Sequence, residues 1–409
     1  MEKIYKREDY LKKVRAFYND DMIKVISGIR RCGKSFFLKS IIQELLEKGV
    51  KEKDIIYIEL DKKEYKNIKK STQLEKIIDD KIIDDDFKYL VIDEVQNVKD
   101  FEPLINSYRE TGNISIFITG SNSYLLSGEL VTKLTGRYIE IEMMTLSFYE
   151  YVDMKRFLGK YVNDNIYLEF EEYIRNGGFP KSLYYDNYDA KITYTSSVID
   201  QIFDKDIKTS NKIKDKALFE AIEKFVINNF GAVISIKNIQ NYLQKGIKVS
   251  VDRRTIKRYL DILEKAKILY SCDLFDIKSK VVLKGEKKYY LADLSIYYSQ
   301  NTDNRINYGS VLENVMYSYL KSKNYKLSVG YIGKLECDFI ARENYDEYYY
   351  IQVSKDISNN ETEEREYKPF YMIKDSYPRY LFTMDMLLQK RDGVNHFNIV
   401  DFIYNNKNL

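Results

Sequence analysis

The sequence has 409 residues, 44% of them hydrophobic, and this length suits two or three domains of roughly 150 residues, each with a buried core. Its 66 Lys and Arg residues nearly balance 63 Asp and Glu residues, and the resulting net charge of +3 identifies no class of partner. Three widely spaced cysteines and a single histidine argue against a disulfide framework and against zinc or histidine-rich metal sites. No apolar run reaches the roughly 20 residues of a membrane helix, and the charged N-terminus lacks a signal-peptide stretch, so we expect a soluble, cytoplasmic protein without membrane contact.

Residues 1–145 alternate between strand-like and helical segments. Short apolar strands are predicted at residues 22–27, 55–60, 89–92 and 114–119, and apolar residues recur with helical spacing over residues 35–47. This alternation is typical of a parallel sheet with helices on both faces, so the fold class predicted for this part is α/β.

A phosphate-binding motif follows the first predicted strand. The run Gly28-Ile-Arg-Arg-Cys-Gly-Lys-Ser35 fits GxxxxGK[ST], the Walker A pattern, with a strand before it and a helix after it. Its glycines let backbone N–H groups surround phosphates, while Lys34 reaches the β- and γ-phosphates of ATP and Ser35 ligates Mg²⁺. The predicted nucleotide-binding residues are Gly28, Arg30, Arg31, Cys32, Gly33, Lys34, Ser35 and Phe36. For Arg30 and Arg31 two interpretations stay open, contact with the nucleotide and exposure to solvent.

A carboxylate pair ends the strand Tyr89-Leu-Val-Ile-Asp-Glu94, which is a Walker B pattern. Asp93 is placed to hold the hydration shell of Mg²⁺, and Glu94 to orient and polarise the attacking water. A plain turn would explain such a pair alone, but the P-loop upstream favours the catalytic interpretation.

Two further residues are predicted to contact the γ-phosphate. Ser121, with Asn122 after it, follows the strand Ile116–Thr119 and is the candidate sensor of the γ-phosphate or the lytic water. Arg137, in Leu134-Thr-Gly-Arg, is a candidate to stabilise transition-state charge in its own or a neighbouring subunit. A strand-end turn and a surface salt bridge are the respective alternatives.

The remaining sequence changes in character twice. Residues 146–210 are mainly helical, interrupted by the loop NGGFP at residues 176–180. Residues 215–295 contain three amphipathic helices and then two β-like stretches around a charged turn at Gly285, which together indicate a winged helix. A helix after Ser310 and strands at residues 326–332, 335–341 and 348–354 indicate a small α/β unit.

The segments GIRRCGKS, YLVIDEVQ, FITGSNSYLLSGEL and LTGRYIEIEMMTLSFYEY resemble, in this order, a prokaryotic family of AAA-type ATPases whose C-terminal domain has no known function. The resemblance covers most of the chain and is more specific before residue 210 than after it. It implies an additional-strand P-loop ATPase at residues 1–145, with Asp93, Glu94, Ser121 and Arg137 in the roles given above. It also implies a helical lid at 146–210, a winged helix at 211–300 and a restriction-endonuclease-like α/β domain at 301–409.

The third helix of the predicted winged helix has a basic outer face. Four cations follow the N-cap candidate Asp252, while its apolar residues form a separate core stripe. These cations are Arg253, Arg254, Lys257 and Arg258. A basic third helix fits contact with DNA, and a solvated face or a protein-contact surface are the alternatives.

The last predicted unit contains part of an endonuclease pattern. Glu313 on a helix and Asp338 on a strand fit the first two carboxylates, which would hold a divalent metal. In Ile351-Gln-Val-Ser-Lys355, however, Gln352 stands where a carboxylate is expected and Ser354 where a lysine is expected. Lys355 points to the opposite face of a strand and cannot replace Ser354. We therefore predict an endonuclease-type sheet that does not cut DNA.

The leading hypothesis is an ATP-binding and ATP-hydrolysing switch or motor that acts on DNA or a protein partner through its C-terminal half, with ATP and Mg²⁺ as cofactors. An ATP-gated, metal-dependent nuclease is the alternative. A P-loop kinase is a third hypothesis, which Glu94 disfavours because a carboxylate there activates water. Whether the chain forms a homo-oligomer stays open, because Arg137 acts either on the nucleotide of its own subunit or on that of a neighbouring subunit.

Overall fold

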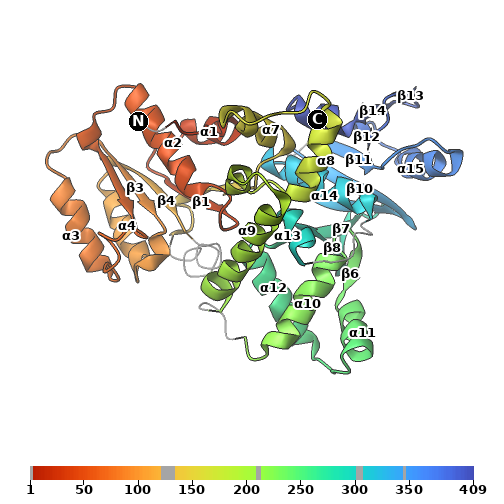
Figure 1. Cartoon of the computed structure of the whole chain (residues 1–409), viewed down its shortest axis with the longest axis horizontal. Helices are drawn as coiled ribbons and strands as arrows, with labels where there is room; N and C mark the ends of the chain where they lie inside the picture. The colour runs from red at the N-terminus through yellow and green to blue at the C-terminus, as the bar shows by residue number, and fades with distance from the viewer. Residues whose placement is uncertain (1–2, 121–133, 209–212, 301–306, 344–346) are drawn as a thin grey trace. The chain divides into compact units, whose positions relative to one another are not determined.

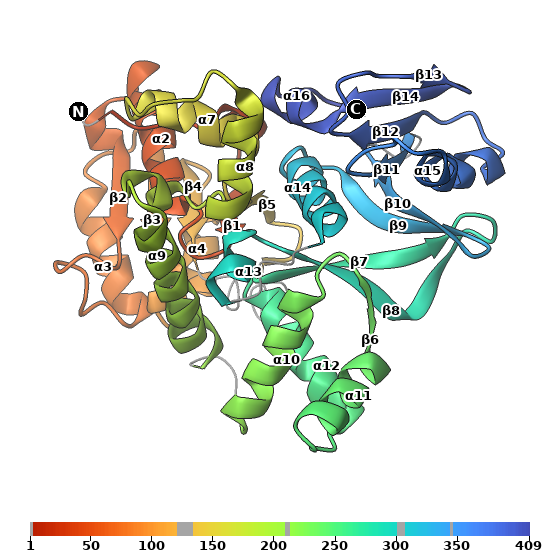
Figure 2. The same cartoon turned by 45° about the vertical axis from the view of Figure 1, so that its right-hand side comes forward.

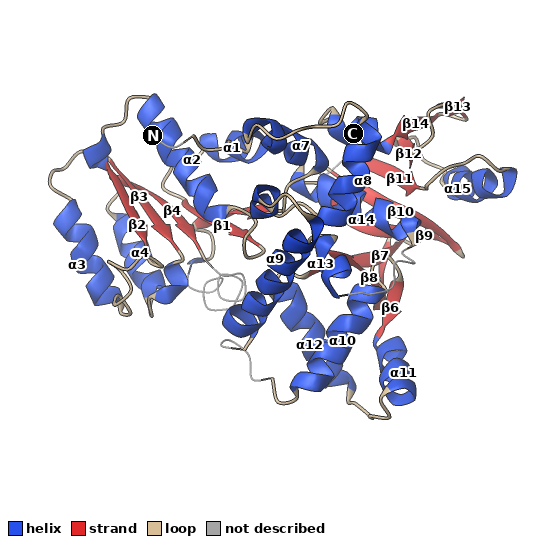
Figure 3. Cartoon of the chain, viewed as in Figure 1, coloured by secondary structure: helices blue, strands red, loops and turns tan. Residues whose placement is uncertain are grey.

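The structure is a computed structural model that describes residues 3–120, 134–208, 213–300, 307–343 and 347–409 (Figure 1). The chain divides into two compact units. Unit 1 comprises Met1–Met143 and Gln201–Asn211, and unit 2 comprises Met144–Asp200 and Lys212–Leu409. Unit 1 contains a five-stranded sheet and unit 2 a nine-stranded sheet (Figure 3).

The predicted parallel α/β core is confirmed in unit 1. Its strands are all parallel, in the order β2-β3-β4-β1-β5. They are β1 (Ile23–Gly28), β2 (Ile55–Glu59), β3 (Lys88–Asp93), β4 (Ile114–Thr119) and β5 (Tyr138–Met143). Parallel strands bring their carboxyl ends to one edge, so Gly28, Asp93 and Thr119 end neighbouring strands at the same edge.

Helices pack on both faces of this sheet because alternate strand residues point in opposite directions. Ile116 and Ile118 of β4 belong to a core cluster that also contains residues of α3 and α4. Phe117, between them, faces the other layer, where its ring centroid lies 6.0 Å from that of Tyr18. The helices of unit 1 are α1 (Glu8–Arg15), α2 (Lys34–Glu47), η1 (Glu52–Asp54), α3 (Ser71–Lys81), η2 (Val95–Asn97), α4 (Phe101–Glu110) and the π-helix η4 (Ile202–Ile207).

The N-terminal segment is fastened to α2. The guanidinium of Arg15 donates to Glu44 at 2.7 and 3.0 Å, and the Tyr18 hydroxyl donates to the same carboxylate at 2.6 Å. Arg7 donates to the carbonyl of Cys32 at 3.4 Å. These contacts hold the loop and helix that follow β1 from the N-terminal side.

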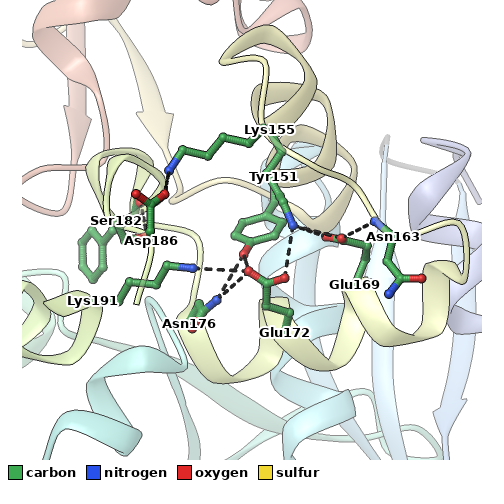
Figure 4. Close-up of polar contacts among 11 residues, drawn as sticks. Tyr151, Lys155, Asn163, Glu169, Glu172, Asn176, Ser182, Asp186 and Lys191 are labelled. Atoms are coloured by element: carbon green, nitrogen blue, oxygen red, sulfur yellow. Dashed lines mark hydrogen bonds and ion pairs between the residues drawn. The ribbon is translucent and has the colours of Figure 1, made fainter. Parts of the chain in front are cut away.

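Unit 2 begins with a helical section held together by buried charges (Figure 4). The ammonium of Lys155 lies 2.7 Å from Glu169 and 3.1 Å from Glu172, and Lys191 lies 3.3 Å from Glu172. The Tyr151 hydroxyl donates to Glu172 at 2.9 Å. Each buried ammonium therefore has a carboxylate partner, as burial of a charge requires. The elements here are α7 (Phe148–Phe157), α8 (Ile166–Asn176), η3 (Pro180–Tyr184) and α9 (Tyr188–Gln201).

The NGGFP loop needs its glycines because a buried carboxylate lies against them. Gly178 donates its N–H to Asp293 at 2.8 Å. A Cβ on Gly177, whose φ is +70°, would lie 1.8 Å from Asp293 Oδ1, and a Cβ on Gly178 would lie 2.2 Å from the Leu146 carbonyl oxygen. The loop is therefore a packing feature that joins the helical section to the strand end before Asp293.

Three helices and a hairpin follow (Figure 2). The helices lie where the sequence predicts them, whereas Gly285, predicted in the hairpin turn, lies within β8, and the turn falls at residues 277–280. The assignment of these elements as a winged helix stays a prediction. The elements are α10 (Lys216–Asn228), β6 (Val233–Ser235), α11 (Ile236–Gly246), α12 (Arg253–Lys265), β7 (Leu269–Asp276), β8 (Val281–Leu291) and α13 (Ser295–Gln300).

The strands before and after residue 300 belong to one sheet, in the order β13-β14-β12-β11-β10-β9-β7-β8-β6. The junction is a parallel pairing of β7 with β9, in which Leu274 lies beside Val329. The remaining elements are α14 (Tyr308–Ser322), β9 (Lys326–Ile332), β10 (Leu335–Arg342), β11 (Tyr348–Val353), α15 (Asn360–Met372), β12 (Arg379–Thr383), β13 (Lys390–Arg391), β14 (Val394–Asn398) and α16 (Ile399–Tyr404).

Candidate functional site

The loop between β1 and α2 is shaped by two glycines. Gly28 has a φ of +137°, and a Cβ there would lie 2.2 Å from the Met143 carbonyl oxygen. Gly33 has a φ of +108° and caps the N-terminus of α2. Both positions exclude other residues, by space or by backbone conformation. The free N–H groups of the first turn of α2 therefore point into this narrow loop, an arrangement that binds anions.

The side chain of Lys34 lies along this loop. Its ammonium donates to the carbonyl of Gly28 at 2.8 Å and to that of Ile29 at 3.3 Å, and the residue is buried. The cation is thus held at the rim of the same loop into which the backbone N–H groups point. Both features favour a ligand with several negative charges.

Asp93 connects the ends of β3 and β4 with the first turn of α2. The Ser35 hydroxyl is hydrogen-bonded to its carboxylate, and the Thr119 hydroxyl donates to Asp93 Oδ1. Burial raises the pKa of Asp93 because it disfavours the anion, and the two hydroxyl groups act in the opposite direction. Ser35 and Asp93 together offer a hydroxyl and a carboxylate oxygen at one point, the ligand types that Mg²⁺ prefers.

Glu94 follows Asp93 in a backbone conformation that is uncommon for a residue with a side chain. Its φ is 59° and its ψ 46°, in the left-handed region. The backbone N–H of Glu94 donates to Thr119 Oγ1 at 3.0 Å, and Gln96 donates to its carboxylate. The charge of Glu94 acts on Arg30, in the loop that follows β1, where it favours the charged guanidinium.

Thr119 is the residue of this site that sequence reasoning passed over. It lies inside the segment Ile116–Asn122, where attention went to Ser121 because the serine follows the strand. The feature of the sequence that could have identified Thr119 is a small polar side chain at the last position of an apolar strand. Ser121 and Asn122 lie outside the described residues.

The two loop arginines differ in exposure: the Arg30 side chain is largely buried, whereas Arg31 is exposed to solvent, one of the two interpretations left open for it. Contact with the nucleotide stays a prediction for both. Arg30 forms two hydrogen bonds to Asp206 of η4, at 2.8 and 3.0 Å, with both side chains largely buried. Arg31, whose φ is 69°, donates to Gln201 at 3.1 Å. Burial alone lowers the pKa of Arg30, but Asp206 outweighs it and the pKa is raised. The segment 201–207 is therefore attached to the P-loop by both arginines.

Cys32 and Phe36 differ in their surroundings. Cys32 is fully buried, with its pKa raised by burial, so its thiol is a packing group. Phe36, in the first turn of α2, is 54% exposed, and the ammonium of Lys39 lies 5.4 Å from its ring centroid. Of the two side chains, Phe36 is the one available to a ligand.

Arg137 lies at the opposite edge of the sheet from Gly28. It precedes Tyr138, which pairs with Ile23 at the start of β1, five residues before Gly28. At about 3.3 Å per residue this separation is roughly 17 Å, beyond the reach of an arginine side chain. The parallel register of β1 and β5 therefore separates Arg137 from the loop after Gly28 in its own chain, and its role stays a prediction.

The four cations predicted on the third helix, Arg253, Arg254, Lys257 and Arg258, are all exposed on α12. The hairpin that follows adds exposed lysines at its tip. These are Lys278, Lys280 and Lys284.

Comparisons with known proteins agree with this geometry. A family model described as an AAA domain matches residues 20–152, and one described as a domain of unknown function (DUF8612) matches residues 167–316. An uncharacterized protein of Haemophilus influenzae is 34% identical over 400 residues, which are 97% of this chain and 98% of that protein. Uncharacterized protein MJ1544 of Methanocaldococcus jannaschii is 30% identical over 341 residues, 79% of this chain and 70% of that protein.

Among solved structures, the Walker-type ATPase paby2304 of Pyrococcus abyssi aligns with a TM-score of 0.49 and 15% identity, over 72% of this chain and 94% of that chain. The AAA-domain match, the parallel sheet and the P-loop define a P-loop ATPase of the AAA type. The chain belongs to the same family as the Haemophilus influenzae protein and MJ1544. Within the described part of the chain, no helix has both the length and the apolar character needed to cross a membrane.

Proposed function

We propose that this protein binds ATP together with Mg²⁺, hydrolyses it, and uses the cycle as a switch or motor that acts on DNA. The observation that carries the proposal is the meeting of Ser35, Asp93 and Glu94 at the P-loop edge, joined by Thr119. A phosphate loop alone would bind nucleotide, whereas the added carboxylate pair supports hydrolysis.

The residues at this edge fit the nucleotide and the metal. The loop around Gly28 has no room for a Cβ, as expected where backbone approaches phosphates closely. Lys34 would meet the β- and γ-phosphates, and Ser35 and Asp93 would hold Mg²⁺. When bound, Mg²⁺ supplies charge neutralisation at the phosphate oxygens. The protein's own contribution is to fix these oxygen ligands through the Thr119 hydroxyl.

Glu94 is the proposed general base. Its backbone is held by Thr119, so the carboxylate is positioned by a rigid turn rather than by a free loop. A carboxylate at this point orients water for in-line attack and accepts its proton. This role favours hydrolysis over transfer of phosphate to a substrate hydroxyl.

Ser121 and Arg137 complete the proposal with different kinds of support. Ser121 is proposed as the sensor because it follows Thr119, the last residue of β4, by two positions in the sequence. Arg137 is exposed at the opposite edge. We propose that it acts in trans, on the γ-phosphate of a neighbouring copy, which makes a homo-oligomer the hydrolysing form.

Contact with DNA is proposed through α12 and the β7–β8 hairpin. The exposed cations of α12 and the hairpin lysines form the basic surface that a helix and wing would need for phosphate contact. A protein partner is the other outcome for this surface. The test uses the double variant Arg254→Glu with Arg258→Glu. The control has the same change of charge at two exposed lysines elsewhere, Lys368→Glu on α15 combined with Lys374→Glu just after it.

We expect the α12 double variant to bind duplex DNA at least 10-fold more weakly than the control, with a shallower dependence on salt and unchanged basal ATP hydrolysis. Equal binding of both double variants would remove α12 from the DNA surface. Undetectable binding of wild-type protein at low salt would make α12 a protein-contact surface. ATP hydrolysis measured with and without single- and double-stranded DNA tests whether the two activities are coupled.

A further inference from the structure

A buried lysine lies among the carboxylates of the endonuclease-like pattern. Lys288, on β8, places its ammonium 2.9 Å from Glu313, 2.5 Å from Glu336 and 4.0 Å from Asp338. Its side chain is only 4% exposed. Glu313 belongs to α14 and the other two carboxylates to β10, so one cation joins three elements of unit 2.

This lysine corrects an expectation drawn from the sequence. The pattern lacked a cation because Ser354 replaces the usual lysine, and the Ser354 hydroxyl donates to the Asp356 carbonyl, at 3.2 Å. Lys355 is exposed, with its ammonium 5.7 Å from the Tyr308 ring centroid. The cation of this cluster instead comes from a strand that precedes α14 in the chain.

The carboxylates do not fit a divalent metal in this arrangement. Mg²⁺ needs oxygen ligands at about 2.1 Å around one point. The oxygens of Asp54, Asp84 and Asp86 in unit 1 all lie within 4.8 Å of one another, whereas those of Glu313, Glu336 and Asp338 do not converge as closely. The ammonium of Lys288 lies between them.

Neighbouring groups hold the carboxylates in this arrangement. The Tyr290 hydroxyl donates to Glu313 at 3.2 Å, and the Tyr331 hydroxyl donates to Glu336. Asp338 accepts the backbone N–H of Val353 at 2.8 Å. These donors use lone pairs that a metal would need.

Gln352 is fixed as an amide by its two partners. Its Oε1 accepts the backbone N–H of Asp338 at 2.8 Å, and its Nε2 donates to Glu366 at 2.8 Å. A carboxylate at this position could not donate to Glu366 and would add negative charge beside it. Gln352, which departs from the endonuclease pattern, therefore makes two hydrogen bonds that a carboxylate could not both make.

The charges are consistent with a permanent ammonium. Burial alone lowers the pKa of Lys288, but Glu313, Asp338 and Glu336 outweigh it, and the pKa is raised. Burial raises the pKa of Asp338, the most distant of the three from the ammonium. The lysine therefore stays charged at any ordinary pH.

We propose that Lys288 is a resident cation that replaces the divalent metal of an endonuclease-type centre and bridges β8 to α14 and β10. The centre is then a structural joint without nuclease activity. Because β8 is one strand of the proposed DNA-binding hairpin, the joint fixes that hairpin to the rest of the sheet. This inference does not depend on ATP hydrolysis.

The test is Mn²⁺ binding to the full chain, followed by electron paramagnetic resonance, with Asp93→Asn present throughout to weaken the P-loop metal site. In this background we compare Lys288→Ala with the control Lys287→Ala, a half-buried neighbour on the same strand. We also compare Asp338→Asn alone and combined with Lys288→Ala. We expect Lys288→Ala to gain one Mn²⁺ site that disappears when Asp338→Asn is added. Lys287→Ala and Asp338→Asn alone should bind the same number of ions as the background.

A second readout is thermal unfolding. Lys288→Ala should unfold at a lower temperature, and Mn²⁺ should restore part of the loss, which it should not do for Lys287→Ala. A folded Lys288→Ala that gains no Mn²⁺ site would overturn the proposal. The proposal would also be overturned if the background protein, with Lys288 intact, bound a Mn²⁺ ion that Asp338→Asn removes. DNA cleavage by the wild-type chain that is lost in Asp338→Asn would overturn it as well. The last two comparisons remain decisive if Lys288→Ala does not fold.

Discussion

The Thr119 hydroxyl donates to the carboxylate of Asp93 while it accepts the backbone N–H of Glu94. One side chain at the end of β4 thus holds the carboxylate of Asp93 and the backbone of Glu94 at the end of β3. The two strands are neighbours in the sheet, so this contact depends on strand order and not on local sequence. In an ATPase of this class, a change at the end of β4 would be transmitted directly to the metal-binding and water-activating groups.

Thr119→Val should reduce ATP hydrolysis by roughly 10- to 100-fold and change ATP affinity only a few-fold. Valine has nearly the same shape but removes one of the two hydroxyl donors of Asp93 and the acceptor of the Glu94 backbone N–H, at a cost of about 1–3 kcal/mol for each buried group. Steady-state hydrolysis and nucleotide titration measure the two effects. Thr119→Ser retains the hydroxyl and should recover most of the activity; failure of this rescue would argue against the hydrogen-bonding role.

Lys34→Ala should weaken ATP binding on the order of 100-fold, because it removes charge-assisted contacts to the phosphates. Titration with a fluorescent ATP analogue provides the measurement. Lys39→Ala, one turn further along α2, is the matched control and should bind normally. Unchanged affinity in Lys34→Ala would contradict the P-loop assignment.

Asp206→Asn should destabilise unit 1 by roughly 2–4 kcal/mol, because it leaves the largely buried guanidinium of Arg30 without its counter-ion. Asp204→Asn changes an exposed carboxylate in the same π-helix and serves as the control. Thermal or urea unfolding should separate the two variants. If both unfold like the wild type, the pair contributes little to the attachment of residues 201–207 to the P-loop.

Glu223, buried on α10, should give the stability a pH dependence. Burial raises its pKa to about 7, above the ordinary value near 4.5. The folded state therefore holds a proton that the unfolded chain releases, so its stabilising effect is present below about pH 4.5 and is lost as the pH rises through 7.

Glu223→Gln removes this titration. The variant should be roughly 1–3 kcal/mol more stable than the wild type at pH 8, with the difference shrinking as the pH falls toward 4.5. Urea unfolding across this range provides the test, with the exposed Glu361→Gln as control. A difference that grows toward low pH would show that the sign is wrong.

The sequence identifies the residues of the proposed nucleotide site where they stand in consecutive positions. Lys34, Ser35, Asp93 and Glu94 follow from two short motifs, since each motif carries its own strand and turn. Thr119 was not recognised, because its role appears only when β3 and β4 pair.

Contacts between distant segments were not predictable in the same way. The Arg30–Asp206 pair joins residues 176 positions apart, and no periodicity signals such a contact. Lys288 likewise reaches Glu313 and Glu336 from a separate strand, so the endonuclease pattern appeared to lack a cation. The position of Arg137 needed the parallel register of β1 and β5 before its distance from Gly28 was evident.

The central claim is tested most directly by magnesium-dependent ATP hydrolysis in Glu94→Gln. Hydrolysis and ATP affinity are measured for this variant and for the wild type under the same conditions. The amide keeps the shape of the side chain and loses the base, so we expect ATP affinity within a few-fold of wild type and hydrolysis reduced about 100-fold or more. Hydrolysis by Glu94→Gln at the wild-type rate would contradict the assignment of this site as the hydrolytic centre.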